Sequence, residues 1–251
     1  MPGPLGIERS ADSQGRSHRV ARYVAGAYVR GWPQSSPKAR EGYGARVPDA
    51  GYSDRRIQSV NIAHVRPNPF KDASETGIDK RPVDGPVMVR APGTMLTGFG
   101  SGLVGDFIGD RSAHGGDDQA VYAYTREDLD QWESRLGREL PSGSFGENLT
   151  TAGLDVNGAR IGERWRIGAE LELEVTGSRV PCATFRGWMD RRGWLREFTL
   201  AAIPGAYLRV LTPGEVRAGD AVVVSYRPTD APTVADEFRA EMGISSSDPA
   251  S

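Results

Sequence analysis

The chain has 251 residues, of which 38% are hydrophobic and 25% charged, a composition typical of a globular protein with a sizeable core. Its 31 basic and 33 acidic side chains give a net charge of −2, so no overall positive field favours nucleic acid or an anionic membrane as a partner. The single cysteine, Cys182, excludes an intramolecular disulfide and argues against a zinc or iron–sulfur site built from several cysteines. With no signal-like or membrane-spanning apolar segment in the sequence, we expect a cytoplasmic protein.

Residues 1–56 differ in charge and texture from the rest of the chain. They carry 10 basic and 5 acidic side chains, whereas residues 57–251 carry 21 and 28. Little apolar periodicity is present, so we expect a largely disordered, basic N-terminal extension with one short helix near residues 18–30. A basic nucleic-acid-binding arm is the functional alternative, but the arginines are scattered, as in a solvated tail.

From residue 57 onward the sequence predicts short strands and a few helices. Strands are expected at 57–65, at Val87–Arg90 and, between glycines, at 102–110, with an exposed stretch at 66–75. The clearest helix is TREDLDQWESRLG, where Thr125 and Asp128 fit a capping box and Gly137 suits the position after the last turn.

The second half continues this alternation. Leu171, Leu173 and Val175 alternate with glutamates, which indicates a half-buried strand, and 222–226 repeats the pattern less clearly. The segment 193–202 is expected to be helical and to lead into a strand at 206–211. Thr233 and Asp236 fit a second capping box at the start of a short amphipathic helix in the C-terminal tail, 228–251.

This pattern predicts the fold class. Gly makes up 32 of the 251 residues, and the glycines separate short apolar runs. About eight short strands with two or three helices favour a mainly β protein, a closed or nearly closed β-barrel with peripheral helices. We expect this domain to occupy residues 57–227.

Cys182 is the first candidate for chemistry. It follows a predicted strand in SRVPCATF, with Arg179 and Arg186 nearby in sequence. A lone cysteine is most often a small buried hydrophobic side chain. Cationic neighbours, however, favour the thiolate, which is both a nucleophile and a soft metal ligand.

A second candidate is HGGDDQAVYAY, which begins at His114. The histidine could bind an anion or act as an acid or base near neutral pH, although many histidines are structural hydrogen-bond donors. Gly115 and Gly116 permit positive φ or a close approach of the backbone to a ligand, and a turn alone would also explain them.

Two further loops carry polar residues. SGSFGENLTT places Glu147 and Asn148 at a turn, where Asn148 could simply cap the backbone. TGIDK offers Thr76 and Lys80, and Lys80 is either an anion contact or an ordinary exposed lysine. None of these loops has Walker or Rossmann spacing, so a nucleotide-binding loop of either kind is not supported.

These motifs together resemble a known family. TGIDKRPV, HGGDDQAVYAY, FGENLTTAGL, IGERWRIG and SRVPC, in this order, resemble the MOSC family (molybdenum cofactor sulfurase C-terminal domain), and most closely its YiiM-like branch, over about residues 57–226. The resemblance implies a β-barrel of the pyruvate-kinase-barrel type that binds the molybdenum cofactor (molybdopterin), with pyridoxal phosphate binding as a further possibility at the level of the family.

The resemblance also implies roles for the candidate residues. Cys182 would be the protein ligand to molybdenum and catalytic together with His114. Cationic and backbone partners for the pterin phosphate would come from Lys80, Arg179 and the turn His114–Gly116, with Thr76 also at the cofactor. Glu147 and Asn148 would shape the pocket floor.

The implied activity is the reduction of N-hydroxylated small molecules such as 6-hydroxylaminopurine, with electrons from a separate donor protein. One position departs from the family pattern, because many relatives have a lysine two residues after the cysteine where this chain has Thr184. Arg186 is the residue that could substitute for it.

Two other functions remain open from the sequence. Cys182 could carry a persulfide, which would make the protein a sulfur carrier or a cofactor-handling module without turnover of a small molecule. The chain could also be a ligand-binding barrel without chemistry, for which Thr184 is the only indication.

Overall fold

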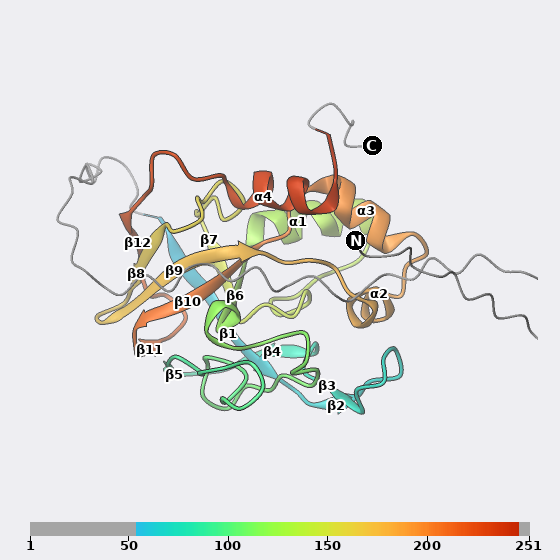
Figure 1. Ribbon diagram of the computed structural model, residues 1–251, viewed down its shortest axis with the longest axis horizontal. Coiled ribbons are helices and arrows are strands. Elements are labelled where there is room, and N and C mark those ends of the chain that lie inside the picture. The colour runs from blue at the N-terminus through green and yellow to red at the C-terminus, as the bar shows by residue number, and fades with distance from the viewer. Residues whose placement is uncertain (1–53, 246–251) are drawn as a thin grey trace, which may run out of the picture. The chain divides into compact units, whose positions relative to one another are not determined.

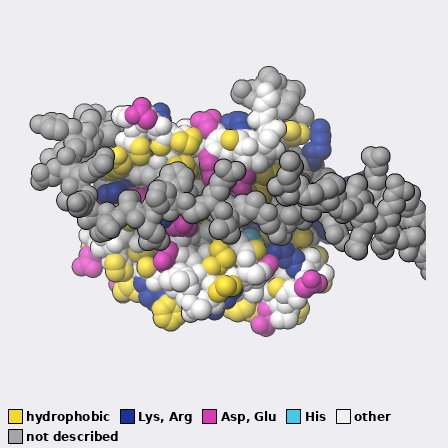
Figure 2. Space-filling view, in the orientation of Figure 1, with side chains coloured by type: hydrophobic (Ala, Val, Ile, Leu, Met, Phe, Trp, Pro, Cys, Tyr) yellow, Lys and Arg dark blue, Asp and Glu magenta, His cyan; other side chains and the backbone are white. Residues whose placement is uncertain are grey.

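The computed structural model describes residues 54–245, which form one large mixed sheet, two small two-stranded sheets and four α-helices (Figure 1). The predicted N-terminal extension and its helix near 18–30 lie almost wholly outside these residues. Charged side chains of both signs are spread over the visible face (Figure 2). Among residues 54–245, no helix combines the length and the apolar character needed to cross a membrane.

The large sheet has eight strands and is mixed rather than purely antiparallel. In spatial order they are β12 (Val222–Tyr226), β8 (Arg164–Ile167), β9 (Leu171–Ser178), β10 (Ala206–Thr212), β6 (Val121–Thr125), β7 (Leu149–Ala152), β1 (Arg56–Ala63) and β4 (Lys80–Pro82). Neighbours are antiparallel except β6 and β7, which are parallel. The two small sheets pair β2 (Arg66–Pro67) with β3 (Glu75–Thr76), and β5 (Val87–Val89) with β11 (Gly214–Val216).

Backbone hydrogen bonds link the start of β1 to the segment that leads into β12. Ile57 N donates to Asp220 O at 2.9 Å, and Val222 N donates to Arg55 O at 3.0 Å. These bonds bring β1 close to β12, although the two strands lie in opposite parts of the sheet order. The strands described above confirm a mainly β fold, whereas closure of the sheet into a barrel stays a prediction.

The helices follow local sequence signals at three of four places. Thr125 Oγ accepts a hydrogen bond from Asp128 N at the start of α1 (Arg126–Leu136), and Gly137 adopts a left-handed conformation after its last turn. Thr233 caps α4 (Val234–Met242) in the same way, and α3 (Trp194–Ala201) lies where a helix was expected. The fourth, α2 (Ala183–Met189), was not anticipated.

The core consists of two parts. Alternate residues of β9, namely Leu171, Leu173 and Val175, are buried in an aliphatic core beneath the sheet, as their alternation predicts. An aromatic cluster fills the other part, where α1, α3 and α4 lie on one side of the sheet (Figure 1). Its buried rings include Trp132, Trp194, Phe145, Phe185 and Phe198.

The prediction of a strand at 102–110 is wrong. Only Leu103 forms an isolated bridge, with Val89, and the rest of the segment is irregular. Gly105 has φ +89°, and a side chain at Gly109 would collide with the carbonyl oxygen of Glu75. These glycines fold the segment into a loop that turns the Asp106 carboxylate inward, where it meets Lys80.

Candidate functional site

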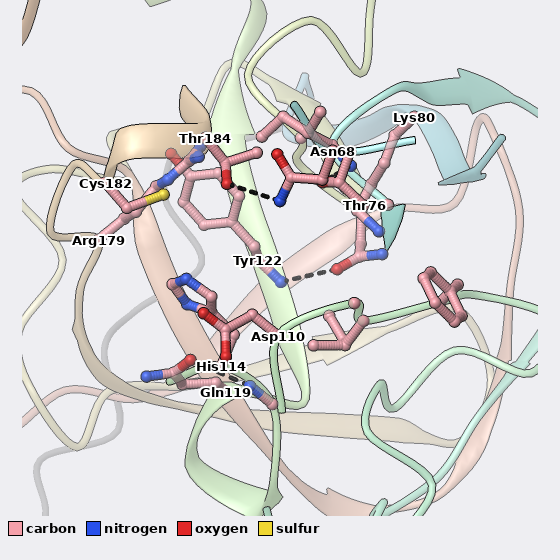
Figure 3. Close-up of a pocket in the computed structure, with 18 of the residues that line it drawn as sticks. Asn68, Thr76, Lys80, Asp110, His114, Gln119, Tyr122, Arg179, Cys182 and Thr184 are labelled. Atoms are coloured by element: carbon pink, nitrogen blue, oxygen red, sulfur yellow. Dashed lines mark hydrogen bonds between the residues drawn. The ribbon is translucent and has the colours of Figure 1, made fainter. Parts of the chain in front are cut away.

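A pocket of about 100 Å³ lies where several loops meet the ends of β6, β9 and β10 (Figure 3). Its walls come from segments far apart in the sequence, between Asn68 and Tyr207. Seven of the residues expected at the site line it, namely Thr76, Lys80, His114, Gly115, Asn148, Arg179 and Cys182. Gly116 and Glu147 do not line the pocket.

Cys182 lies between β9 and α2, as the residue just before the first turn of that helix, and its thiol is free and partly buried. Burial by itself raises the pKa of this thiol, but a hydrogen bond from His114 and the positive charge of Arg179 outweigh it. The backbone N–H of Phe185, at the helix start, also favours the charged form. The pKa of Cys182 is therefore lowered to about 6, which makes it a thiolate at neutral pH.

Arg179 is a buried cation beside this thiol. Its side chain is only 6% exposed, and it forms no ion pair with a carboxylate of residues 54–245. Its guanidinium lies 4.0 Å from the centre of the Phe185 ring and 5.0 Å from that of Tyr122, and it donates to Phe145 O. A buried cation without an acidic partner favours an anion, and the Cys182 thiolate is one with which Arg179 interacts.

His114 belongs to the glycine-containing loop that precedes β6 and lines the pocket. Its backbone N–H donates to Asp110 O at 3.0 Å, and the Asp110 carboxylate is bound by Lys71 Nζ at 2.7 Å. Figure 3 shows the imidazole on the same side of the pocket as Cys182 and Arg179. The loop thus places an acid–base group at the sulfur.

The paired glycines shape this loop rather than offering amides to a ligand. Gly115 and Gly116 have φ of +91° and +80°, values that only glycine adopts readily. Gly115 N donates to Gln119 Oε1 at 3.2 Å and Gly116 N donates to Gly100 O at 3.0 Å. Both N–H groups therefore have partners within the protein, which argues against their role in phosphate binding.

Lys80 does not supply a free charge either. Its Nζ lies 2.6 and 2.7 Å from the two carboxylate oxygens of Asp106, and both side chains are almost completely buried. Asp106 also accepts hydrogen bonds from Ser101 and Asn148. The geometry thus contradicts an exposed lysine and gives Lys80 a structural ion pair at the pocket wall.

Glu147 and Asn148 hold loops together beneath the pocket. The fully buried Glu147 carboxylate accepts hydrogen bonds from Gly143 N at 2.5 Å and Phe145 N at 3.0 Å. Burial raises its pKa. Asn148 Oδ1 accepts from Tyr122 N at 3.2 Å, which is the backbone-capping role considered from the sequence.

Comparison with known proteins identifies the family. Residues 110–223 match the model of the MOSC domain. This part of the chain is therefore similar to a MOSC domain. The resemblance inferred from the motifs is thereby confirmed.

Several curated proteins are similar to this chain. The chain is 34% identical to the uncharacterized protein YflK of Bacillus subtilis over 58% of its own length and 61% of that protein. It is 29% identical to the protein YiiM of Escherichia coli over 64% of this chain and 69% of the relative. A protein of Gibberella moniliformis named "Reductase" is 28% identical over 68% of this chain, which spans only 29% of that relative. The chain thus spans less than two thirds of YflK and of the reductase.

Solved structures agree on the MOSC fold. The crystal structure of YiiM from Geobacillus stearothermophilus has a TM-score of 0.59 and 26% identity, covering 74% of this chain and 83% of that one. YiiM from Escherichia coli has a TM-score of 0.56 and 22% identity, covering 76% and 79%. The second likeness supports the fold alone.

Thr184, at the position where the family resemblance leads us to expect a lysine, lines the pocket and has a partner. Its Oγ1 accepts a hydrogen bond from Asn68 Nδ2 at 3.2 Å, which connects α2 to the loop after β2 (Figure 3). Arg186 is exposed and does not line the pocket, so it does not replace the missing lysine. The pocket therefore lacks the cationic side chain that the family resemblance leads us to expect at this position.

Sequence reasoning missed two tyrosines of the site. Tyr207 on β10 and Tyr122 on β6 both line the pocket, with ring centres 5.3 Å apart. Burial raises the pKa of each hydroxyl, so both remain protonated. Nothing in the sequence separates them from ordinary strand tyrosines, because only the pairing of β10 with β6 brings them together.

The side chains at the pocket offer a metal one soft ligand but do not form a complete metal site. Within residues 54–245, no group of three or more His, Cys, Asp or Glu side chains is arranged to hold a metal ion. Cys182 offers a single thiolate, which fits a metal that a cofactor already holds by its other ligands. A pocket of about 100 Å³ encloses only one end of a ligand as large as molybdopterin, because sites for drug-sized ligands measure roughly 300–1,000 Å³.

Proposed function

We propose that this protein binds the molybdenum cofactor through Cys182 and is an oxidoreductase that reduces N-hydroxylated small molecules such as 6-hydroxylaminopurine. The observation that carries the proposal is the Cys182 thiolate, with its pKa lowered to about 6, in a pocket of a MOSC domain. The relatives add support, since one is named a reductase.

The proposed reaction is a two-electron reduction. R–NHOH takes up two electrons and two protons and gives R–NH₂ and water. When bound, the cofactor would supply the redox and oxygen-transfer chemistry that this reaction needs. The electrons come from a separate donor protein.

The residues around the thiolate have complementary tasks in this proposal. Cys182 holds the metal end of the cofactor, and the buried charge of Arg179 keeps this sulfur in its anionic form. His114, bonded to the same sulfur, donates a proton to the leaving hydroxyl group. Tyr122 and Tyr207 form part of the pocket wall, where they restrict the access of water.

Two expectations change in the light of the geometry. Arg179 neighbours the sulfur, so we place it at the metal end of the pocket rather than at the pterin phosphate. We do not extend the proposal to pyridoxal phosphate, because Lys80, the one lysine that lines the pocket, is ion-paired with Asp106. We retain the barrel at 57–227 and the cytoplasmic location as parts of the proposal.

The test is the metal content of protein purified from a host that makes the molybdenum cofactor. We expect close to one molybdenum per chain for the wild type and almost none for Cys182→Ala, with loss of 6-hydroxylaminopurine reduction. Thr199→Val, a change on α3 outside the pocket lining, serves as the control. Wild-type protein without molybdenum would defeat the proposal.

The same thiolate favours a second candidate, a sulfur carrier with a persulfide on Cys182. Incubation with a persulfide donor, R–S–SH, would then transfer its outer sulfur to Cys182 and release R–SH, which adds about 32 Da, the mass of one sulfur atom, to the wild type and not to Cys182→Ser. Persulfide formation in protein that lacks both molybdenum and reductase activity would favour this candidate over the reductase.

A further inference from the structure

One surface of the helical side of the protein is rich in arginine. The last turn of α1, the end of α2 and the turn into α3 carry six exposed arginines, which we call the arginine face: Arg135, Arg138, Arg186, Arg191, Arg192 and Arg196. The acidic side chains on these segments are Glu133, which is paired with Arg126, and Glu139, Asp190 and Glu197. Figure 2 shows dark blue side chains at the right, where Figure 1 places α2 and α3.

Much of the charge on this face is not neutralised. Arg191 is paired with Glu197 at 2.7 Å, but Arg192 and Arg196 form no ion pair within residues 54–245. On the sheet, by contrast, Arg164 and Arg209 each lie within 4 Å of a carboxylate. The face is therefore positive on a body in which residues 57–251 carry 21 basic and 28 acidic side chains.

The face also has a concave centre. Arg135, Arg192 and Arg196 border a common surface hollow of about 520 Å³, together with Gly193, Leu200, Ala201 and Glu197, whose carboxylate is paired with Arg191. Three positive side chains around one hollow give a convex acidic partner both charge and shape to match.

A short aromatic connection joins this hollow to the candidate site. Trp194, which follows Gly193 at the hollow, has its ring centre 5.4 Å from that of Phe185. Phe185 in turn lies 4.0 Å from the Arg179 guanidinium, which lines the pocket with Cys182. Two aromatic rings in series, those of Trp194 and Phe185, thus lie between the hollow and Arg179 at the proposed metal end of the pocket.

We propose that the arginine face is the docking surface for an acidic electron-donor protein. This inference rests on the proposed function, in which each R–NHOH reduced needs two electrons and two protons. A flavodoxin or a plant-type ferredoxin is a donor of this chemistry, and each would deliver the two electrons one at a time. Charge attraction would bring the donor to the face, and the aromatic connection would give the shortest covered route inward.

The experiment compares a charge reversal on the face with one elsewhere. Arg192→Glu/Arg196→Glu is the test variant, and Arg166→Glu/Arg217→Glu, on β8 and beside β11 at the opposite end in Figure 1, carries the same change in net charge. Molybdenum-loaded proteins are assayed with reduced flavodoxin, with reduced ferredoxin, and with dithionite and methyl viologen. Binding of both donor proteins is measured separately by surface plasmon resonance at low and high salt.

We expect the test variant to raise the KM for the better donor protein about 10-fold at low salt, with viologen-driven activity unchanged. The control variant should behave as the wild type. Equal donor affinity in wild type and test variant, or binding of neither donor, would overturn the inference. So would tight binding of single-stranded RNA lost only in the test variant. Absence of viologen-driven turnover in the wild type defeats the proposed function instead, and the binding data then decide about the surface alone.

Discussion

Lys80 Nζ and the Asp106 carboxylate form a buried ion pair at the wall of the candidate pocket, with distances of 2.6 and 2.7 Å. Asp106 accepts further hydrogen bonds from Ala63 N, Ser101 Oγ and Asn148 Nδ2. Although burial opposes ionisation, the charge of Lys80 and the hydrogen bonds from Lys80, Ser101 and Asn148 lower the pKa of Asp106. The pair connects β1, β4, the loop after Leu103 and the end of the loop before β7.

Lys80→Met should therefore destabilise the fold. Removing one partner leaves the Asp106 carboxylate buried without its counter-charge, which costs about 3–5 kcal/mol. Lys71→Met removes the more exposed pair with Asp110 and should cost about 1 kcal/mol or less. Urea unfolding of both variants measures the difference, and equal losses would show that Lys80 has no special structural role.

Cys182 should react as a low-pKa thiol. Burial alone would raise its pKa. The hydrogen bond from His114 and the charge of Arg179 outweigh this effect, and the pKa falls from 9.0 to about 6. The rate of alkylation by iodoacetamide should therefore rise with pH with a midpoint near pH 6. His114→Ala should move this midpoint upward. Because the chain has one cysteine, Cys182→Ser gives the blank, and a midpoint above pH 8 in the wild type would contradict the prediction.

The same shift links folding stability to pH. The folded pKa lies below the unfolded value, so ionisation of Cys182 stabilises the fold increasingly as pH rises from about 6 toward 9. This contribution is lost as pH falls through 6. Cys182→Ala should have a flatter profile of unfolding free energy across that range, as urea titrations at several pH values would show.

The sequence was informative wherever a local signal fixes the backbone. Thr125 and Gly137 mark both ends of α1, and the alternation around Leu173 marks β9, because caps and period-2 burial act over a few residues. Cys182, Arg179 and His114 could be selected from motifs, although only the structure shows that they meet.

Features that depend on contacts between distant segments could not be found this way. The seven-residue α2 contains Thr184 and Gly187, both weak helix formers, and its position depends on packing of Phe185 and Met189 in the aromatic cluster. The loop at 102–110 has the apolar texture of a strand, but it bends around Asp106. The ion pair of Lys80 is invisible in sequence, because Asp106 is 26 residues away and in no motif.

Ionisation of Asp128 should destabilise the fold, whereas ionisation of Cys182 stabilises it. Burial, together with the nearby charges of Asp155 and Glu127, raises the pKa of this carboxyl from 3.8 to about 6. The folded state therefore holds its proton more tightly than the unfolded state, and stability falls as pH rises from about 4 to 6. Asp128→Asn can still accept the hydrogen bond from Asn157 and cannot ionise.

At pH 7.5 we expect Asp128→Asn to be more stable than the wild type, because removal of the unfavourable buried charge gains about 1–3 kcal/mol. Loss of the negative charge near the helix N-terminus reduces this gain by about 0.3–1 kcal/mol. At a pH of about 3.5 the two proteins should be nearly equal. Asp130→Asn, on the exposed side of α1, is the matched control. Urea unfolding at both pH values decides, and a variant less stable than wild type at pH 7.5 would be evidence against the pKa shift.

The hydrogen bond between Asn68 and Thr184 should anchor the loop between β2 and β3 beside the pocket. Thr184→Val keeps the shape of the side chain but removes the acceptor, at a net cost of about 1 kcal/mol. Amide hydrogen exchange across residues 68–74 should become faster. The control is Thr199→Val on α3, which should leave the exchange unchanged. Unchanged exchange in Thr184→Val as well would show that other contacts hold the loop.

Residues 1–53 should be dispensable for the MOSC domain. We expected the domain to begin at residue 57, but β1 starts at Arg56, and Val222 N donates to Arg55 O at the junction with β12. A truncation that begins at Asp54 keeps this bond, whereas one that begins at Ile57 removes it together with the bridge between Arg56 and Ala221. The longer form should match the full chain in melting temperature and molybdenum content, and the shorter one should melt earlier. If the longer form fails to fold, the N-terminal extension is part of the domain; if both truncations melt alike, the bonds between β1 and β12 contribute little to holding the sheet together.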